Sequence, residues 1–250
     1  MQQNNAASKV PEVTLIFWVI KILATTLGET AGDAVSMSMN LGYLLGTGIF
    51  AAVFIVAVST QIKAEKFHPL LYWLTIIATT TVGTTLADFA DRSLGMGYTG
   101  GTTILLALLL ASLFVWHRTL GSIAVDTVNS PKAEAFYWIT IMFSQTLGTA
   151  LGDWTADSMK FGYAGSALIF GALLAVIAVA YFKSKLSHTL LFWAAFILTR
   201  PLGAVVGDLL DKPLASGGLA LSRYTASAVL LVCIAALIVF FPQRAARRSH

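Results

Sequence analysis

The amino-acid sequence predicts an all-α integral membrane protein in which eight transmembrane helices form four parallel helical hairpins, arranged as pseudo-two-fold halves. Three observations lead to this prediction: the composition, the number of apolar runs and a motif that occurs four times. Hydrophobic residues make up 57% of the chain, charged residues make up 11%, and the mean hydropathy is +0.78. Soluble domains contain about 25% charged residues, so this composition indicates a chain that lies largely in lipid.

Eight apolar segments are long enough for a helix to cross a bilayer. They lie at roughly 13 to 36, 41 to 60, 69 to 90, 99 to 116, 134 to 156, 164 to 182, 189 to 210 and 223 to 241. The N-terminus before the first segment is polar and lacks a cleavable signal pattern, so we expect the first segment to be a retained helix.

The odd-numbered segments share a motif. Each contains a tryptophan that follows Phe or Tyr, a glycine ten residues later and an aspartate fifteen residues later. The tryptophans are Trp18, Trp73, Trp138 and Trp193, the glycines are Gly28, Gly83, Gly148 and Gly203, and the aspartates are Asp33, Asp88, Asp153 and Asp208. Each unit therefore comprises a helix with the motif, a short loop and a plain helix, which predicts four tandem hairpins.

The tryptophans are spaced by 55, 65 and 55 residues, so the two halves of the chain are offset by 120 residues. We expect an N-terminal half at 1–125 and a C-terminal half at 126–250, which together form one membrane domain. Repeats 1 and 3 share the related sequences LGETAGD and LGTALGDW, and repeats 2 and 4 share DxxD followed by a basic residue. These likenesses predict a pseudo-two-fold relation between the halves.

These features resemble a family of bacterial multi-pass membrane proteins built of four tandem repeats of unknown function, each with two transmembrane helices and a characteristic tryptophan. The resemblance covers the chain from about Phe17 to Phe241. It implies the architecture and a location in the bacterial inner membrane. It implies no active site, so the functional hypothesis rests on the residues themselves.

Lysine and arginine are distributed unevenly between the two sides of the predicted bundle. The side that holds both termini has ten of the sixteen basic residues, the opposite loops have four, and Lys21 and Arg200 lie within helices. The positive-inside rule therefore makes both termini cytoplasmic. These flanks also explain the net charge of +4, so no nucleic-acid partner is expected; the oligomeric state stays open.

Because each repeat has two helices, all four repeats enter the bilayer from the same side, and equivalent residues lie at equal depth. With a rise of about 1.5 Å per residue, the four aspartates would form one layer in the outer half of the membrane. The pairs Gly28/Gly32, Gly148/Gly152 and Gly203/Gly207 are GxxxG motifs, and Gly83/Ala87 is a variant. Such pairs predict close packing of the odd-numbered helices, with the even-numbered helices as an outer wall.

Residues that break the repeat are candidates for function. Glu29, Lys21 and Arg200 each occupy a position where the other repeats have no charge. Lys21, Thr25, Glu29 and Asp33 are four residues apart and form a polar stripe on one helix. Arg200 precedes Pro201, which is expected to kink or break the seventh helix, as at many transport sites.

Charged groups at mid-membrane are unfavourable by about 2.5 to 3.5 kcal/mol each, so five acids and two bases within helices call for a role. Carboxylate, hydroxyl and amide oxygens suit protons, sodium, magnesium, calcium or manganese, and no HxxxH, CxxC or EF-hand motif is present. We therefore hypothesise a small-cation transporter of the divalent-metal class, with proton exchange as its coupling. The cation would bind to the five carboxylates within the helices, namely Glu29, Asp33, Asp88, Asp153 and Asp208. If the cation is a metal, its direct ligands would be Glu29, Asp33 and Asp153. The counter-charges would be Arg200 and Lys21.

Three alternatives stay open. A ring of aspartates at one depth also suits a cation channel. In a scaffold or sensor, the aspartates would be structural and would pair with Arg92, Lys212 or Arg200. An anion carrier would use Arg200. Enzyme activity is not expected, because no nucleophile–base pair, nucleotide loop or cofactor motif is present, and the one bound group expected is a metal cation.

Overall fold

The computed structural model describes residues 8–246, and within that range the regular secondary structure is helical. The long helices are α1 (Leu15–Asp33), α2 (Gly42–Lys63), α3 (Pro69–Asp88), α4 (Gly97–Leu120), α5 (Pro131–Asp153), α6 (Gly162–Lys183), α7 (His188–Asp211) and α8 (Arg223–Phe240). Three π turns extend α1, α3 and α5, namely η1 (Ala34–Ser38), η2 (Phe89–Ser93) and η4 (Trp154–Ser158), and two 3-10 turns, η3 (Val125–Thr127) and η5 (Leu214–Ser216), lie in loops.

Three of the four odd-numbered helices begin at a side-chain N-terminal cap, and the fourth begins at a proline. The side chains of Thr14, Ser130 and Ser187 accept hydrogen bonds from backbone N–H groups in the first turns of α1, α5 and α7. Pro69 starts α3, and at that position its missing N–H has no intrahelical partner to lose. The eight long helices therefore correspond one by one to the eight predicted segments.

Seven of these helices, as far as the described residues extend, are long and apolar enough to cross a membrane. The exception is α5, which has a similar length but carries Ser144, Gln145 and three threonines. It packs against α3, α4 and α7, so its polar side chains face other helices. The all-helical fold class is thus confirmed, with seven candidate spans where the sequence predicted eight.

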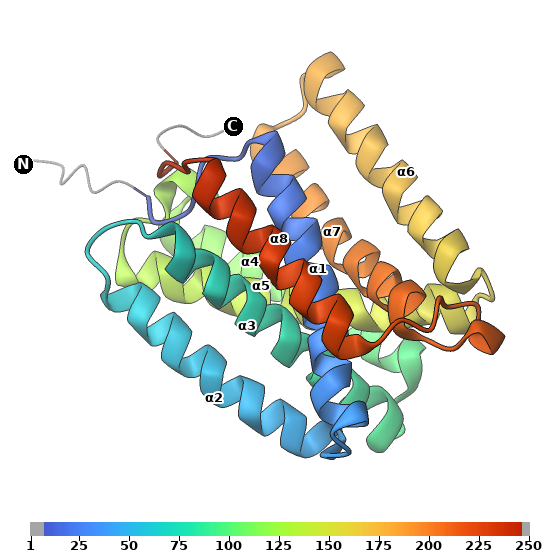
Figure 1. Cartoon of the computed structure of the whole chain (residues 1–250). Coiled ribbons are helices and arrows are strands. Elements are labelled where there is room, and N and C mark those ends of the chain that lie inside the picture. Colours follow the sequence, from blue (N-terminus) through green and yellow to red (C-terminus); the bar gives the residue numbers. More distant parts are fainter. Residues whose placement is uncertain (1–7, 247–250) are drawn as a thin grey trace, which may run out of the picture.

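The odd-numbered helices form an inner ring. The contacts run from α1 to α3, from α3 to α5 and from α5 to α7, and α7 closes the ring on α1. The even-numbered helices lie outside the ring, and most of their residues are exposed (Figure 1). The predicted packing of the odd-numbered helices inside an outer wall is confirmed.

The outer helix of each repeat packs mainly on the next repeat. The main contacts pair α2 with α3, α4 with α5, α6 with α7, and α8 with α1. The predicted hairpins are therefore consecutive in sequence but are not the main packed pairs. The chain turns away after α1, α3 and α5 through a π turn and a residue of positive φ, such as Gly42 or Gly162, and after α7 through the 3-10 turn η5.

The repeated glycines lie where neighbouring inner helices touch. In each repeat the first glycine faces the next inner helix of the ring: Gly28 faces Thr80, Gly83 faces Gln145, Gly148 faces Arg200, and Gly203 faces Thr25. The second glycines do the same, since Gly32 faces Thr84, Gly152 faces Ala204, and Gly207 faces Glu29. A Cβ atom at any of these positions would crowd its neighbour, so the predicted role of these glycines in helix packing is supported.

Pro201 does not break α7. The helix is continuous from His188 to Asp211. The proline ring lies opposite Gly148, where an added Cβ would come 3.1 Å from Pro201 Cδ, so the small residue makes room for the ring. The Thr199 hydroxyl donates to the carbonyl of Phe196 at 2.8 Å. The prediction of an interrupted helix is therefore wrong.

The two ends of the described chain meet over one end of the bundle. Pro11 and Ala245 form an isolated β-bridge, and the backbone N–H of Glu12 donates to the carbonyl of Arg244 at 2.8 Å. Lys9 forms an ion pair with the buried carboxylate of Glu134 at 2.7 Å. These contacts tie the N-terminal segment, the C-terminal segment and the start of α5 into a cap (Figure 1).

Substituting Gly83→Ala should destabilise the protein by about 1 to 3 kcal/mol, because the new methyl group would lie 3.0 Å from backbone atoms of Gln145 and Thr146 and would push α3 from α5. The matched control is Gly171→Ala on α6, where an added Cβ meets no atom within 4 Å. Thermal unfolding of the purified protein measures both. Equal melting temperatures for Gly83→Ala and the wild type would contradict the ring packing.

Candidate functional site

The inner ring encloses a column of five layers, each with one residue from every inner helix. Successive layers are four residues apart along each helix, so they stack on one face. The layers are Phe17/Tyr72/Tyr137/Phe192, Lys21/Ile76/Ile141/Phe196, Thr25/Thr80/Gln145/Arg200, Glu29/Thr84/Thr149/Ala204 and Asp33/Asp88/Asp153/Asp208. None of these residues is more than 6% exposed. The column thus runs from an aromatic layer to an aspartate layer through the bundle interior.

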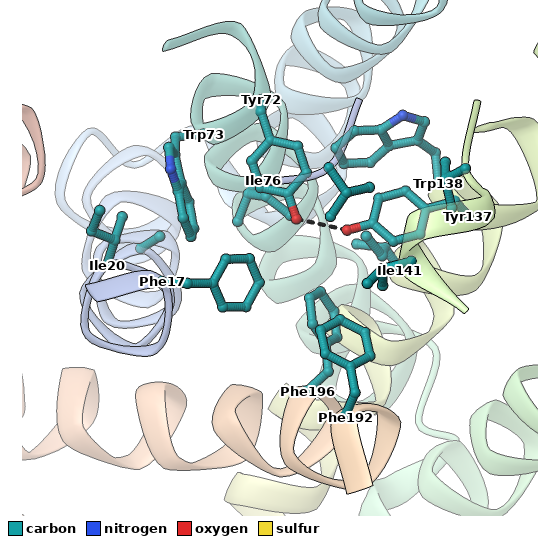
Figure 2. Packing of buried hydrophobic residues seen from close by; sticks show 14 of the residues in the cluster. Phe17, Ile20, Tyr72, Trp73, Ile76, Tyr137, Trp138, Ile141, Phe192 and Phe196 are labelled. Carbon is teal, nitrogen blue, oxygen red and sulfur yellow. Dashed lines mark hydrogen bonds between the residues drawn. The ribbon is translucent and has the colours of Figure 1, made fainter. Parts of the chain in front are cut away.

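The aromatic layer closes one end of the column (Figure 2). The hydroxyl groups of Tyr72 and Tyr137 point toward each other and form a hydrogen bond of 2.6 Å. The ring centroids of Phe17 and Phe192 lie 6.3 Å apart. In addition, each aromatic ring contacts the tryptophan of the next repeat: Phe17 with Trp73, Tyr72 with Trp138, Tyr137 with Trp193, and Phe192 with Trp18. The repeated aromatic–Trp pair therefore links the repeats in a ring.

Arg200 and Glu29, two of the residues that break the repeat, meet in the middle of the column. Arg200 Nη2 donates to Glu29 Oε2 at 3.0 Å and also to the hydroxyl groups of Thr84 and Thr149. Thr84 in turn donates to Glu29 Oε2 at 3.2 Å. One guanidinium nitrogen thus contacts α1, α3 and α5 from α7.

Lys21 lies apart from the acids. Its Nζ lies 3.7 Å from the centre of the Phe196 ring, and among the described residues it has no hydrogen-bond partner. The predicted stripe from Lys21 to Asp33 is buried along its whole length. Only Glu29 and Asp33 in that stripe are ion-paired.

The aspartate layer consists of two pairs, each bridged by a base. Arg92 binds Asp88 at 2.7 Å and Asp153 at 3.0 Å. Lys212 binds Asp208 at 3.0 Å and also binds Asp33. The two sets are related by the offset of 120 residues, and each base joins neighbouring repeats from the two halves.

The scaffold alternative predicted that the aspartates pair with Arg92 and Lys212, and Arg223 is a further base that the sequence did not link to them. Arg92 and Lys212 each follow an aspartate by four residues, one helical turn, so their side chains reach the same layer. Arg223 binds Asp211 at 2.7 Å and lies 3.7 Å from Asp33. The prediction of five acids against two bases is therefore wrong. The shared DxxD-plus-base pattern was the signal that pointed to Arg92 and Lys212.

Lys212 lies just beyond the last residue of α7, at the edge of the aspartate layer. Burial by itself would lower the pKa of Lys212. The carboxylates of Asp208, Asp33 and Asp211 outweigh that effect and raise its pKa above the usual value for lysine. Lys212 is therefore held as a cation between the acids.

Carboxylates converge at two places in the described part of the chain. Glu29, Asp33 and Asp88 each offer one oxygen within 4.8 Å of the others, and so do Asp33, Asp208 and Asp211. The metal ligands named from sequence were Glu29, Asp33 and Asp153. The structure brings the first two together with Asp88 in place of Asp153, although both of these aspartates bind Arg92. Oxygen ligands at such separations suit a hard cation.

Together these features define a helical bundle protein whose inner helices enclose a buried column of charged and polar side chains. The family described as Repeat of Unknown Function (DUF347) matches residues 16–67, 71–122, 136–187 and 191–244. The chain belongs to this family, and the predicted resemblance to a four-repeat family is confirmed. No curated protein and no solved structure gives a significant match.

Replacing Lys212→Met should destabilise the protein by about 3 kcal/mol, because Asp33 and Asp208 would then be buried near one another without their shared base. Adding Asp208→Asn to this variant should recover part of the loss, since one unpaired charge is removed. Lys185→Met, at an exposed position, is the control and should stay within about 0.5 kcal/mol of the wild type. Chemical denaturation in detergent measures these differences. Equal stability of Lys212→Met and Lys185→Met would contradict the bridged pairs.

Proposed function

We propose that this protein is a small-cation carrier of the bacterial inner membrane, with eight membrane-spanning helices and cytoplasmic termini. Its substrate is a divalent metal of the manganese, magnesium or calcium class, and proton exchange couples the transport. The protein acts as a carrier and not as an enzyme.

The observation that carries this proposal is the convergence of buried carboxylates on Asp33. One group adds Glu29 and Asp88, and the other adds Asp208 and Asp211, with oxygens within 4.8 Å in each group. Carboxylates so close together repel one another unless a cation or proton lies between them. The groups come from three inner helices, so movement of one helix would change the coordination.

The charge balance of the aspartate layer supports a divalent substrate. Arg92 carries one positive charge against two carboxylates, and Lys212 with Arg223 carries two against the carboxylates of Asp33, Asp208 and Asp211. If all these groups ionise, each set has one excess negative charge. One divalent cation, or two protons, would balance these ion-paired groups, and the buried carboxyl of Asp91, the counterpart of Asp211 in repeat 2, needs a proton of its own.

The bases give the site a way to respond to occupancy. An entering cation competes with Arg200 for Glu29 and with Lys212 for Asp33, so these ion pairs loosen when the site fills. Because each base also contacts a second inner helix, loosening it changes the packing between repeats. Arg200 is the counter-charge in this scheme. Lys21 is not, because it contacts no acid.

The aromatic layer favours a carrier over a channel. A channel needs a continuous path, whereas the rings of Phe17, Tyr72, Tyr137 and Phe192 are at most 6% exposed and fill the column at the cytoplasmic end. A carrier alternates between two states, and in each of them one end of the path is closed, as the aromatic layer closes this column. The second candidate is a scaffold or sensor, which is favoured by the ion pairs that link neighbouring repeats.

Uptake of manganese, magnesium, calcium and sodium into liposomes, with the internal pH recorded, tests the carrier. Glu29→Gln, Asp33→Asn and Asp153→Asn should each reduce divalent flux by more than about tenfold, since even changes next to metal ligands reduce affinity by about 10- to 100-fold. The control is Asp157→Asn, which changes an exposed carboxylate. Asp157→Asn should transport as the wild type does. Divalent entry should also alkalinise the lumen in step with flux, because the exchanged protons leave as the cation enters.

Two results would contradict the carrier. One is the absence of cation flux in the wild type across a range of ion and pH gradients. The other is flux that is equal in all variants. If the variants have lower melting temperatures but unchanged flux, the aspartates stabilise the fold, and the result favours the scaffold or sensor over the carrier.

Opening the aromatic layer should convert the carrier into a leak. Tyr72→Ala combined with Tyr137→Ala removes both hydroxyl groups and both rings from the closed end of the column. Planar-bilayer recording should then detect cation currents that the wild type lacks. Tyr181→Ala, on the exposed surface of α6, is the control. Single-channel currents from the wild type would instead identify a channel.

A further inference from the structure

The middle of the column holds buried polar atoms, most of them donors, that have no hydrogen-bond partner among the described residues. Lys21 Nζ, Arg200 Nε, Arg200 Nη1 and both amide atoms of Gln145 lack hydrogen-bond partners among the described residues. All three side chains are fully buried, at 0% exposure. Nearly all buried polar groups in proteins are hydrogen-bonded, so three such side chains in one region indicate a function.

The three side chains lie in two consecutive layers and come from three helices. Lys21 on α1 lies over the ring of Phe196, which is one turn before Arg200 on α7. Gln145 on α5 is in the same layer as Arg200, and the glycine one turn further along α5, Gly148, faces the Arg200 side chain. Lys21 therefore lies beside the turn of α7 that precedes Arg200, and Gln145 lies in the layer of Arg200 on the neighbouring helix α5. Thr80, in the same layer on α3, adds a buried hydroxyl that also lacks a partner.

The charges in these layers are unbalanced toward positive. Glu29 is the one acid that contacts this group, and it accepts from Arg200 Nη2. The ammonium form of Lys21 would add a second positive charge, and its one contact is the face of an aromatic ring. A cation–π contact offsets only a small part of the desolvation penalty of a buried ammonium. A water molecule could accept hydrogen bonds here, but it would not neutralise the charge.

From these contacts we infer that Lys21, Arg200 and Gln145 form a binding site for a small monovalent anion, either a halide or a carboxylate. Such an anion accepts hydrogen bonds from the ammonium, from the free guanidinium nitrogens and from the amide. It also balances the charge of Lys21. Only this chain's first repeat has a lysine in that layer, and only its fourth has an arginine in the next, so the column has one such site.

The anion site goes beyond the proposed cation carrier and does not depend on it. It lies between the aromatic layer and Glu29, whereas the carboxylate groups lie between Glu29 and the aspartate layer. A column with both sites occupied contains charges of both signs at different depths. Anion binding and cation flux are measured separately, so one can fail without the other.

Equilibrium binding of radiolabelled chloride to the purified full-length protein tests the inference, with unlabelled acetate as a competitor. The buffer contains a bulky sulfonate as its only other anion. The wild type should bind chloride saturably, and acetate should displace it if carboxylates fit. Lys21→Met and Gln145→Leu should each weaken binding by more than tenfold. Lys132→Met, which removes an exposed charge at the start of α5, should bind as the wild type does.

The melting temperature supplies a second measurement, which can be made on a variant that no longer binds chloride. Without chloride, Lys21→Met should melt above the wild type, because the substitution removes a buried ammonium without a partner. Saturating chloride should raise the melting temperature of the wild type and leave that of Lys21→Met unchanged. The inference is overturned if neither chloride nor acetate binds the wild type. It is also overturned if Lys21→Met and Gln145→Leu bind chloride as tightly as Lys132→Met.

Discussion

The close approach of the four inner helices is the constraint on which the rest of this structure depends. Glycines in each repeat lie directly against the next inner helix, and Gly203 completes the circle by facing Thr25. Without side chains at these points the helices can pack tightly enough for column residues to touch across the axis. The hydrogen bond between Tyr72 and Tyr137 and the three contacts of Arg200 Nη2 are consequences of that approach.

The ring also explains why the repeat is regular at some positions and irregular at others. The aromatic–Trp pair and the glycines occur in every repeat because each makes the same contact with the next one. The aspartate occurs in every repeat because it shares a base with the aspartate of a neighbouring repeat. Positions in the middle layers face the axis, where four copies of one charged residue would repel each other. Lysine, glutamate and arginine therefore occur there once each, and these single residues define the direction and chemistry of the column.

Ion pairing in the aspartate layer serves both structure and the proposed function. Each base joins acids of neighbouring repeats, so removing it would leave buried charges unpaired. The same bases leave an excess of carboxylate charge, which favours binding of a cation or protons. Binding of a cation or protons in the aspartate layer would therefore change the ion pairs that hold the repeats together, and so would change the packing between repeats. The middle of the column has the opposite imbalance, with donors in excess.

The sequence by itself determined the helix count, the four repeats and the inner position of the odd-numbered helices. It also determined the aspartate layer and the polar stripe on the first helix, because a spacing of four along a helix places residues on one face. Tertiary structure decided which residues meet. Arg200 pairs with Glu29, Asp88 replaces Asp153 beside Asp33, and Lys21 contacts a ring instead of an acid. The spacing of residues along one helix fixes the depth of each side chain and the face on which it lies. Contacts between helices depend on the order of the helices around the ring and on the reach of long side chains. The periodicity of a single sequence contains neither.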